Sequence, residues 1–315
     1  MLDLLRCPAC MSRLTHEAGS GEPRLHCTGC GRDYAFLERH PGAALPRLRR
    51  DDDRATLSQD IVVYRSDPES TRRDRRRTVR LAEEREGFLA DLDIALEKGR
   101  DASPWLLDRF VSALPLPVEQ SLVLEARCGE GAVALALADR GLMVLGVDDR
   151  LPPLERAVAA ARTRKGSVTF VEAAVLEAPF AARGFDGVWC DGLFAALRPD
   201  RQDVFFRQVN RILKTGGVLF LTVPRTAPGV AAGRFAFSRW ALGRPVVPGE
   251  NVTRAPDGAG VYHVGTTRAT LHQRLTRHGF RALWLRQTEH DLLVLARKEE
   301  DQRERTMDDH GDVRA

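Results

Sequence analysis

The feature that most constrains the fold of this chain is the segment 123–131, which reads VLEARCGEG. A short apolar run reaches an acid at Glu125, crosses a turn that contains glycine, and enters the alanine- and leucine-rich segment 132–138. This pattern predicts a strand, a tight turn and a helix, an arrangement in which backbone N–H groups face a ligand. A second apolar run, 143–147, ends on Asp148, where an acid suits hydrogen bonds from a ribose. The two predicted strands indicate the first half of an α/β domain that binds a nucleoside.

This turn resembles the glycine-rich first motif of the class I S-adenosylmethionine-dependent methyltransferases, among which the chain is most similar to the type 11 methyltransferases. That motif usually has an acid, two further residues, and then Cys-Gly-x-Gly. The resemblance continues through 185–190 and 209–221 and covers roughly residues 120–298. It implies a seven-stranded Rossmann-like α/β sheet, mostly parallel with an antiparallel last strand, and with helices on both faces. It also implies S-adenosylmethionine as the cofactor and transfer of a methyl group.

The same resemblance implies a set of residues around the cofactor. Glu125 is expected to reach toward the amino group of the methionine part, and Asp148 to hold the ribose hydroxyls. Gly129 and Gly131 are expected to let the backbone approach closely. The full predicted set is Glu125, Arg127, Cys128, Gly129, Gly131, Asp148, Asp149, Ala174 and Cys190. The two cysteines of this set also have a simpler interpretation as small buried hydrophobic residues, and Asp149 as a helix cap.

Methyl transfer from a sulfonium needs mainly positioning, and a general base is needed only when the acceptor is protonated. The sequence identifies no catalytic base. Many small-molecule methyltransferases have a histidine after the fourth strand, where this chain has Ala195 and Ala196. His263, beside Tyr262, has two interpretations: a base contributed by a cover over the site, or an ordinary polar loop residue.

Two positions differ from the family pattern. Arg127 stands where the family usually has glycine, alanine or serine, so its side chain is expected near the methionine part and its backbone in a costly conformation. Ala174 stands where an acid usually bonds the adenine, when Pro179-Phe180 is aligned with the family's adenine loop. Three interpretations follow: an active methyltransferase with an altered site, a degenerate fold that serves as a non-catalytic binding or regulatory module, or an enzyme for a modified cofactor whose extra carboxylate pairs with Arg127.

Two Cys-x-x-Cys pairs near the N-terminus are separated by sixteen residues. Four thiolates at this spacing predict a structural zinc site with no open coordination position. Two disulfides are the alternative, which a cytosolic chain disfavours. Gly29 and Gly31 are expected to supply left-handed backbone in the second turn, and His16 and His26 to lie at the surface. The predicted zinc ligands are Cys7, Cys10, Cys27 and Cys30.

Five parts are predicted along the chain. They are a zinc ribbon at 1–45, a charged linker at 46–80, a helical lead-in or lid at 81–120, the methyltransferase domain at 121–298 with an insertion at 225–262, and a disordered tail at 299–315. The ribbon resembles those that precede some bacterial methyltransferases. The arginines of the linker are interpreted either as an RNA-contacting strip or as a solvated face. The insertion, which interrupts the regular pattern, is either a substrate cover or a disordered loop.

Within these parts, hydrophobic periodicity and turn residues predict the individual elements. Predicted helices span 81–96, 104–114, 152–163, 201–213 and 267–278, and the later strands span 168–171, 185–190, 218–223, 280–287 and 291–297. Gly216-Gly217 is expected to end the fourth of these helices.

Composition adds few constraints on function. Lys and Arg number 48 against 44 Asp and Glu, a net charge of +4 that gives little evidence for a nucleic-acid partner. No apolar run is long enough to span a bilayer, and the first residues lack a signal-peptide pattern. A cytoplasmic protein with no membrane partner is therefore expected. Its acceptor is expected to be RNA or a small molecule, and a protein partner could bind through the ribbon.

Overall fold

The computed structural model describes residues 2–17, 24–37, 45–48, 63–64, 103–164, 166–173, 175–177, 179–197, 199–225, 250–254, 260–288 and 291–300. Several predictions therefore lie outside the described residues. These are the helix 81–96, most of the linker 46–80 with its arginines after Arg47, position Ala174, the tail beyond residue 300, and residues 226–249 and 255–259 of the insertion.

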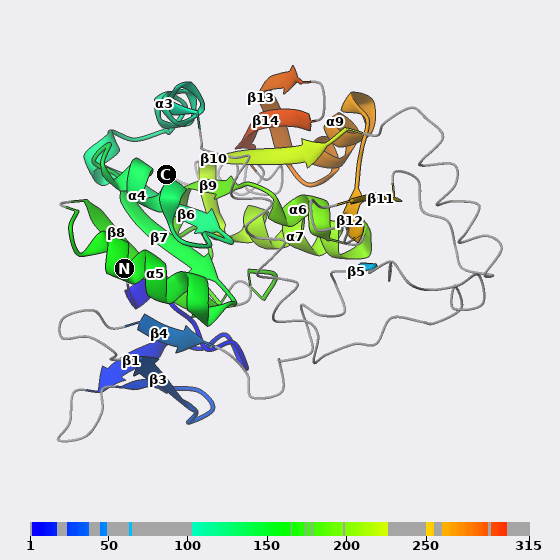
Figure 1. Cartoon of the computed structure of the whole chain (residues 1–315). Coiled ribbons are helices and arrows are strands. Elements are labelled where there is room, and N and C mark those ends of the chain that lie inside the picture. Colours follow the sequence, from blue (N-terminus) through cyan, green and yellow to red (C-terminus); the bar gives the residue numbers. More distant parts are fainter. Residues whose placement is uncertain are drawn as a thin grey trace, which may run out of the picture.

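Seven strands form the central sheet, in the order β8-β7-β6-β9-β10-β14-β13 (Figure 1). They are β6 (Leu122–Ala126), β7 (Met143–Asp148), β8 (Ser167–Ala173), β9 (Phe185–Cys190), β10 (Leu213–Pro224), β13 (Phe280–Gln287) and β14 (Asp291–Lys298). The pairs from β8 to β10 are parallel, and β14 runs antiparallel to both β10 and β13. The predicted Rossmann-like sheet with an antiparallel last strand is thereby confirmed.

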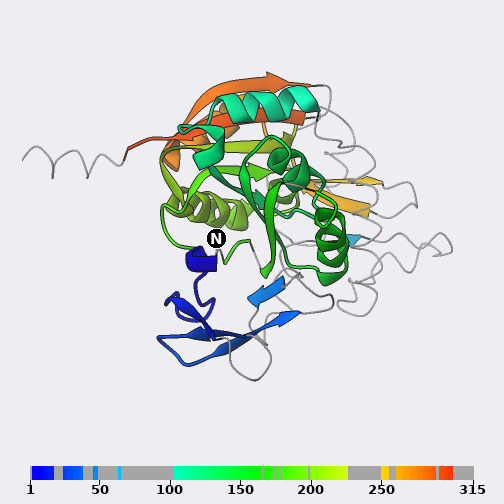
Figure 2. The ribbon, with the colours of Figure 1, turned by 90° about the vertical axis from the view of Figure 1, so that its left-hand side faces the viewer.

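Helices cover both faces of this sheet, as the two views in Figures 1 and 2 show. One face carries α3 (Pro104–Ser112), α4 (Ala132–Ala138) and α5 (Leu151–Ala161). The other carries α6 (Leu193–Ala196), α7 (Pro199–Ile212) and α9 (Arg268–Arg277). Because both faces are buried, the parallel strands are apolar along nearly their whole length, as in β9 where all six residues are buried.

One element boundary was predicted wrongly. The helix α7 ends at Ile212 and β10 begins at Leu213, five residues before the predicted start at Val218. The two glycines lie inside the strand, where the register with β9 shifts between Leu213 and Val218 and Gly216 has φ +78°. They therefore form an irregularity in a strand, and do not end the helix.

Residues 185–187 show why the segment FDG suits the centre of this sheet. The Asp186 carboxylate is buried, accepts a hydrogen bond from the Leu122 N–H at 3.0 Å, and pairs with Lys214 at 2.9 Å. Gly187 gives space to α3, because a Cβ at this position meets Phe110 Cζ at 2.7 Å. These contacts fix β9 beside β6 and hold α3 against the sheet.

The N-terminal segment extends the same sheet. It contains a 3-10 turn (Leu2–Leu4), β1 (Leu14–Glu17), β2 (Arg24–Cys27), β3 (Asp33–Leu37) and β4 (Leu45–Leu48). Strand β4 pairs in parallel with the end of β8, with Arg47 opposite Glu172, so the sheet runs unbroken from β1 to β13. The expected start of the linker at residue 46 falls inside β4.

A second connection joins the N-terminal segment to the loop after β8, and we name it the N-terminal bridge (residues 4–6 and 179–181). Leu5 and Phe180 form an antiparallel β-bridge. The Arg6 N–H donates to the Pro179 carbonyl at 2.8 Å, and the Ala181 N–H donates to the Leu4 carbonyl at 2.7 Å. Leu5 and Phe180 are both fully buried in the same hydrophobic cluster.

The insertion and the linker both contribute strands to a small second sheet, and none of these strands was predicted from the sequence. The sheet has the order β11-β12-β5, with β11 (Glu250–Arg254), β12 (Gly260–Val264) and β5 (Val63–Tyr64). Strand β12 lies beside α6, which follows the end of β9. The side chains of Tyr262 and His263 lie outside the described part of the structure.

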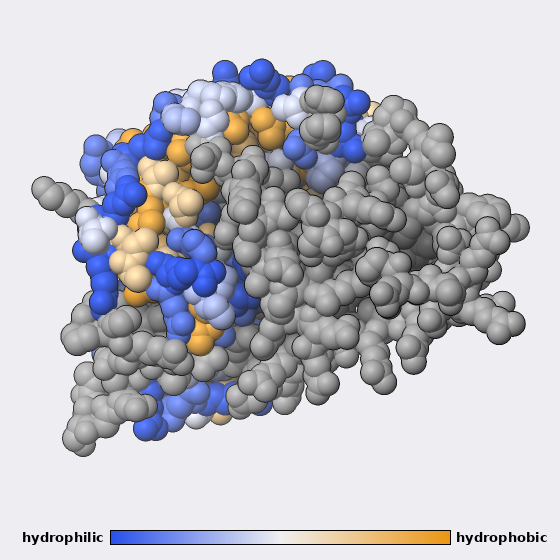
Figure 3. Space-filling view, in the orientation of Figure 1, coloured by the Kyte–Doolittle hydropathy of each residue, from blue (hydrophilic) through white to orange (hydrophobic). Residues whose placement is uncertain are grey.

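The outer surface of α3 shows how this helix is anchored. Trp105 packs edge-on against Trp284 of β13, with Arg286 over the Trp105 ring and Arg109 over the Trp284 ring. In Figure 3 apolar residues reach the surface near α3 and α4 among hydrophilic ones, an ordinary surface composition. Among the described residues, no helix is both long enough and apolar enough to cross a membrane.

Candidate functional site

Charged residues gather at the carboxyl ends of β6, β7 and β9, and we name them the carboxyl-end cluster. Its members are Glu125, Arg127, Asp148, Arg150 and Asp191. Parallel pairing brings them together, because Ala126 lies opposite both Val147 and Cys190 in the sheet. This edge of an open α/β sheet is where ligands usually bind.

Glu125 has a buried carboxyl group that is only partly hydrogen-bonded. It is 5% exposed, and its Oε2 atom has no hydrogen-bond partner within the described residues. Burial raises the pKa of its carboxyl well above the usual value; the Ala134 N–H acts in the opposite direction, and the charges of Asp148 and Asp191 raise it further. A carboxylate in this position is stabilised by a cation that reaches Oε2.

The turn after β6 places Arg127 in a left-handed backbone conformation, as the sequence predicted. Arg127 has φ +63°, the left-handed region in which a residue other than glycine pays on the order of 1–2 kcal/mol. Its charge acts on Asp148 and on Cys190, lowering the pKa of each against the larger effect of burial. Arg127 therefore acts electrostatically on two residues at this end of the sheet, at a position where the family pattern has a small residue.

Packing within the protein explains why one of the motif glycines, Gly131, has no side chain. Gly131 has φ +79° and begins α4, and a Cβ there meets Phe170 Cζ at 2.7 Å and Ala157 Cβ at 3.0 Å. A side chain at this position therefore clashes with β8 and α5. The structure by itself accounts for this glycine without a cofactor.

Asp148 is completely buried and fully hydrogen-bonded. Its Oδ2 atom accepts from the Gly129 N–H at 2.9 Å and from Arg150 Nη2 at 3.0 Å. Its Oδ1 atom accepts from the Arg150 N–H and from Arg150 Nε, both at 3.0 Å. Burial raises the pKa of this carboxyl to about 7, with Asp149 adding to the rise and Arg127 opposing it.

The structure brings together most of the residues that the sequence predicted, but not all of them. Cys128 and Cys190 are buried, as the simpler interpretation expected, and Asp149 is half-buried at the end of β7. Arg150 and Asp191 were missed. The signal for Arg150 was its place two residues after the acid, since a long side chain there can fold back onto a carboxylate.

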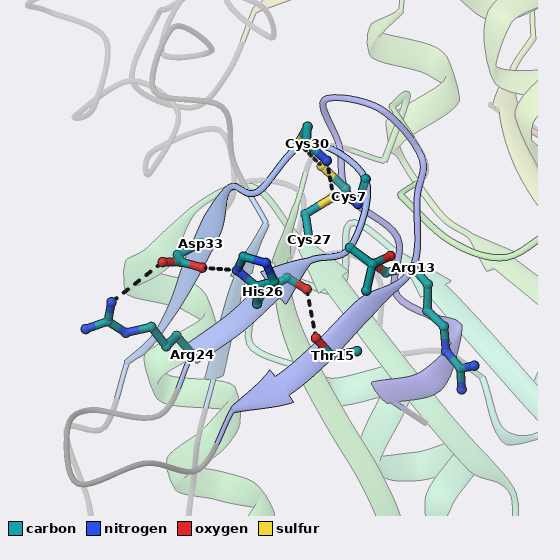
Figure 4. A network of polar contacts seen from close by, with 10 residues as sticks. Cys7, Arg13, Thr15, Arg24, His26, Cys27, Cys30 and Asp33 are labelled. Carbon is teal, nitrogen blue, oxygen red and sulfur yellow. Dashed lines mark hydrogen bonds and ion pairs between the residues drawn. The ribbon is translucent and has the colours of Figure 1, made fainter.

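The four predicted zinc ligands form a second cluster, in the N-terminal segment, and Figure 4 labels three of them, Cys7, Cys27 and Cys30. Their sulfur atoms all lie within 4.8 Å of one another, with Cys7 and Cys30 at 3.6 Å and Cys10 and Cys27 at 3.4 Å. A tetrahedral zinc with bonds of about 2.3 Å places its sulfurs roughly 3.8 Å apart. All six cysteines of the chain are described, and none is in a disulfide.

The backbone around this cluster differs from the prediction in one detail. Gly31 is left-handed with φ +71°, as expected, but Gly29 is absent from the positive-φ residues, and Met11 is left-handed instead, with φ +61°. Gly29 is required for space, because a Cβ there lies 2.1 Å from Ser12 Oγ of the opposite turn. The N–H groups of Gly29 and Cys30 both point at the Cys27 sulfur at 3.4 Å, as outer bonds to a metal ligand do.

The two histidines near this cluster are not among its ligands. His16 is exposed, and the His26 Nδ1 atom bonds the Asp33 carboxylate at 2.8 Å, which also faces Arg24 (Figure 4). The expectation that both lie at the surface is confirmed for His16, while His26 is half-buried.

The described residues fit the two implied groups to different degrees. The unpartnered oxygen of Glu125 fits a cationic amino group, and the four converging sulfurs fit a tetrahedral metal ion. Asp148 fits a ribose only if the donors that now cover it are displaced. Ala174 lies outside the described residues, so the adenine end of the site stays a prediction.

Residues 123–217 match the family model of a methyltransferase domain, which is less than a third of the chain. A search of curated protein sequences finds no match. Among solved structures, a SAM-dependent methyltransferase from Methanosarcina mazei is 22% identical with a TM-score of 0.50, over 58% of this chain and 94% of that one. The [4+2]-cyclase SpnF is 18% identical with a TM-score of 0.51, over 71% of this chain and 98% of that one. At these identities the structures show the fold alone, a Rossmann-like methyltransferase fold, and a fold does not by itself specify the reaction.

Proposed function

We propose that this chain is an S-adenosylmethionine-dependent methyltransferase. The observation that most supports the proposal is the buried Glu125 carboxylate, which has an unpartnered oxygen at the carboxyl end of β6. An uncompensated buried acid is costly for the free protein, and the amino group of the cofactor supplies the missing cation. The match of residues 123–217 to a methyltransferase domain agrees with this role.

The cofactor supplies an electrophilic methyl group on a sulfonium, and the protein has to bind and orient it. Glu125 then holds the amino group, and the turn at Gly129 approaches the cofactor through its backbone. Asp191, at the end of β9, lies where the acceptor is expected. Ala195 and Ala196 are buried in α6, so α6 itself supplies no base, and an acceptor that arrives with a free lone pair needs none.

Calorimetric titration with S-adenosylmethionine and S-adenosylhomocysteine tests the proposal. We expect micromolar binding by the native protein and a loss of at least about tenfold in Glu125→Gln, the usual worth of a hydrogen bond to a charged group. Glu119→Gln is the matched control, because Glu119 is exposed on a 3-10 turn before β6. If the native protein and Arg127→Gly both fail to bind either ligand, the proposal is wrong.

A second candidate is a methyltransferase fold that acts as a non-catalytic binding or regulatory module. Two observations favour it: the strained Arg127 in the turn, and the Arg150 side chain that covers Asp148. Binding that appears only in Arg127→Gly identifies this second function, because a small residue then restores a site that the native side chain fills.

We further propose that the N-terminal cysteines hold a structural zinc ion in a zinc ribbon. The supporting observation is the convergence of four sulfurs with N–H groups aimed at one of them. Metal analysis of purified protein is expected to give one zinc per chain, to be lost in Cys27→Ser and kept in Cys128→Ser. Zinc in both variants, or in neither, contradicts the assignment. Thiolates of this kind persist in a reducing compartment, so we also propose a cytoplasmic location.

The acceptor is proposed to be RNA or a small molecule. The ribbon and the arginines of the linker favour RNA or a protein partner, whereas the aromatics of the insertion favour a small apolar acceptor. Incubation with radiolabelled S-adenosylmethionine and either total RNA or a small-molecule extract separates these, since label on RNA becomes acid-soluble after ribonuclease treatment. Label in neither fraction contradicts both acceptor classes.

A further inference from the structure

The most informative contact of the carboxyl-end cluster is the pair formed by Asp148 and Arg150. A carboxylate has roughly four acceptor positions, two on each oxygen. In Asp148 these receive four donors: the Gly129 N–H, the Arg150 N–H, Arg150 Nε and Arg150 Nη2, at 2.9–3.0 Å. The Asp148 side chain is 0% exposed and the Arg150 side chain is 13% exposed. The acid that the sequence assigns to the ribose is thus already saturated by its own chain.

The four donors differ in how readily they can leave. Two are backbone N–H groups, fixed by the turn after β6 and by the start of α5. The other two belong to one guanidinium, which side-chain rotation can remove together. Two departing N–H donors match in number the two donors that a ribose brings with its 2′- and 3′-hydroxyl groups. A nucleoside can therefore take over these acceptor positions without changing the backbone.

We propose that Arg150 is the residue that sets nucleoside affinity and selectivity at this site. Its guanidinium occupies the ribose position in the free protein, and it leaves when a ligand with a 2′,3′-diol binds. The inference rests on the proposed function, and it adds that ribose recognition occurs by exchange with a built-in competitor. Ligands without both hydroxyls leave the carboxylate with unfilled acceptors, so they do not displace the guanidinium.

Arg127 gives the exchange a physical basis, since Asp148 otherwise loses its countercharge when Arg150 leaves. The charge of Arg127 already acts on Asp148, lowering its pKa against burial. A second cation close to the same carboxylate can stabilise its charged form after the exchange. The two arginines of the carboxyl-end cluster thereby have complementary roles: Arg150 competes with the ribose, and Arg127 remains as the counter-ion of Asp148.

Calorimetry with S-adenosylhomocysteine on the full chain tests the inference. We expect Arg150→Ser to bind at least about tenfold more tightly than the native protein, because a charge-assisted competitor has been removed. Arg156→Ser is the matched control: Arg156 lies on the same helix, pairs with Glu130, and is 57% exposed. The control is expected to stay within about threefold of the native protein, since its charge is screened by solvent.

Two further readouts separate exchange from a merely structural ion pair. The gain in Arg150→Ser is expected with adenosine and absent with 2′,3′-dideoxyadenosine, measured by ligand-observed NMR. In the native protein, the Arg150 Nε–H resonance is expected to be slow to exchange with water when free, and to lose this protection at saturating S-adenosylhomocysteine. This measurement is made on the native protein, and the only variant it requires is Arg150→Lys, which assigns the resonance.

Each outcome bears on one of the two proposals. If the native protein binds and Arg150→Ser binds equally or more weakly, the exchange is wrong while the methyltransferase proposal stands. An unchanged Nε–H resonance at saturation, or an equal gain with the dideoxy nucleoside, also overturns the exchange. Binding by Arg150→Ser when the native protein binds nothing also overturns the exchange, because the guanidinium then never leaves the native site. No binding by any variant overturns both proposals.

Discussion

Truncating Leu5 to alanine tests whether the N-terminal segment and the seven-stranded sheet unfold together. Leu5 is 1% exposed and sits opposite Phe180 in the N-terminal bridge. A fully buried Leu→Ala change costs about 2–5 kcal/mol, and because the backbone bonds of the bridge remain, we expect about 3 kcal/mol. For a cooperative unit of this size, each kcal/mol shifts the melting temperature by about 2–4 °C. The expected shift is therefore about 6–12 °C.

Tryptophan fluorescence reports the unfolding of the part of the chain outside the N-terminal segment. The four tryptophans are Trp105, Trp189, Trp240 and Trp284, so none lies in the N-terminal segment. The matched control is Leu116→Ala, since Leu116 is 40% exposed and a change there is expected to stay within about 0.5 kcal/mol. A tryptophan midpoint that stays within about 1 °C of the native value in Leu5→Ala, while the protein remains folded, refutes the coupling.

Three further predictions concern single side chains. Burial raises the pKa of Glu125 in the folded protein, whereas the pKa of a glutamate in the unfolded chain is about 4.3. The folded protein therefore keeps this proton to higher pH than the unfolded chain does. As a result, the free energy of unfolding falls as the pH rises above the unfolded-state pKa. The free energy of unfolding of Glu125→Gln, measured by urea denaturation, should therefore increase relative to that of the native protein from pH 5 to pH 8. An equal difference between the two proteins at both pH values contradicts the raised pKa. Gly29→Ala places a Cβ 2.1 Å from Ser12 Oγ, and we expect metal content to fall because the two turns are forced apart, whereas full zinc occupancy rejects this reasoning. Gly187→Ala meets Phe110 at 2.7 Å and should destabilise the protein by about 1–3 kcal/mol, a cost measurable by thermal unfolding and absent if α3 moves freely.

The central sheet could be predicted from the sequence because its information is local. Apolar runs bounded by glycine and acids marked each strand, and the pattern Phe185-Asp186-Gly187 marked the strand at the centre. The strand from Leu213 was predicted to begin late because its glycines also suit a helix end, and only the register with β9 distinguishes these roles. Local signals of this kind are most reliable for the existence of an element and least reliable for its boundaries.

The candidate site was predicted less completely than the fold, for a physical reason. The position of Glu125 follows from the strand, but its unpartnered oxygen is a property of everything packed around it. The covering of Asp148 depends on the rotamer of Arg150; the place of Arg150 two residues after the acid permits this contact but does not determine it. The parallel pairing of β4 with β8 joins positions 47 and 172, and a charge-rich segment gave no sign of so distant a partner.

That pairing has a consequence for the order of events during synthesis. Position 172 is 125 residues later in the chain than position 47, and ribosomes add roughly 5–20 residues per second. The N-terminal segment thus waits about 6–25 s for the strand it pairs with. During this interval the four cysteines are close enough in sequence to bind metal on their own, whereas β4 and Leu5 have no partner. If the proposed zinc binds while the chain is still growing, it has a role apart from final stability. It then keeps the first segment compact until the strand with which it pairs has been made.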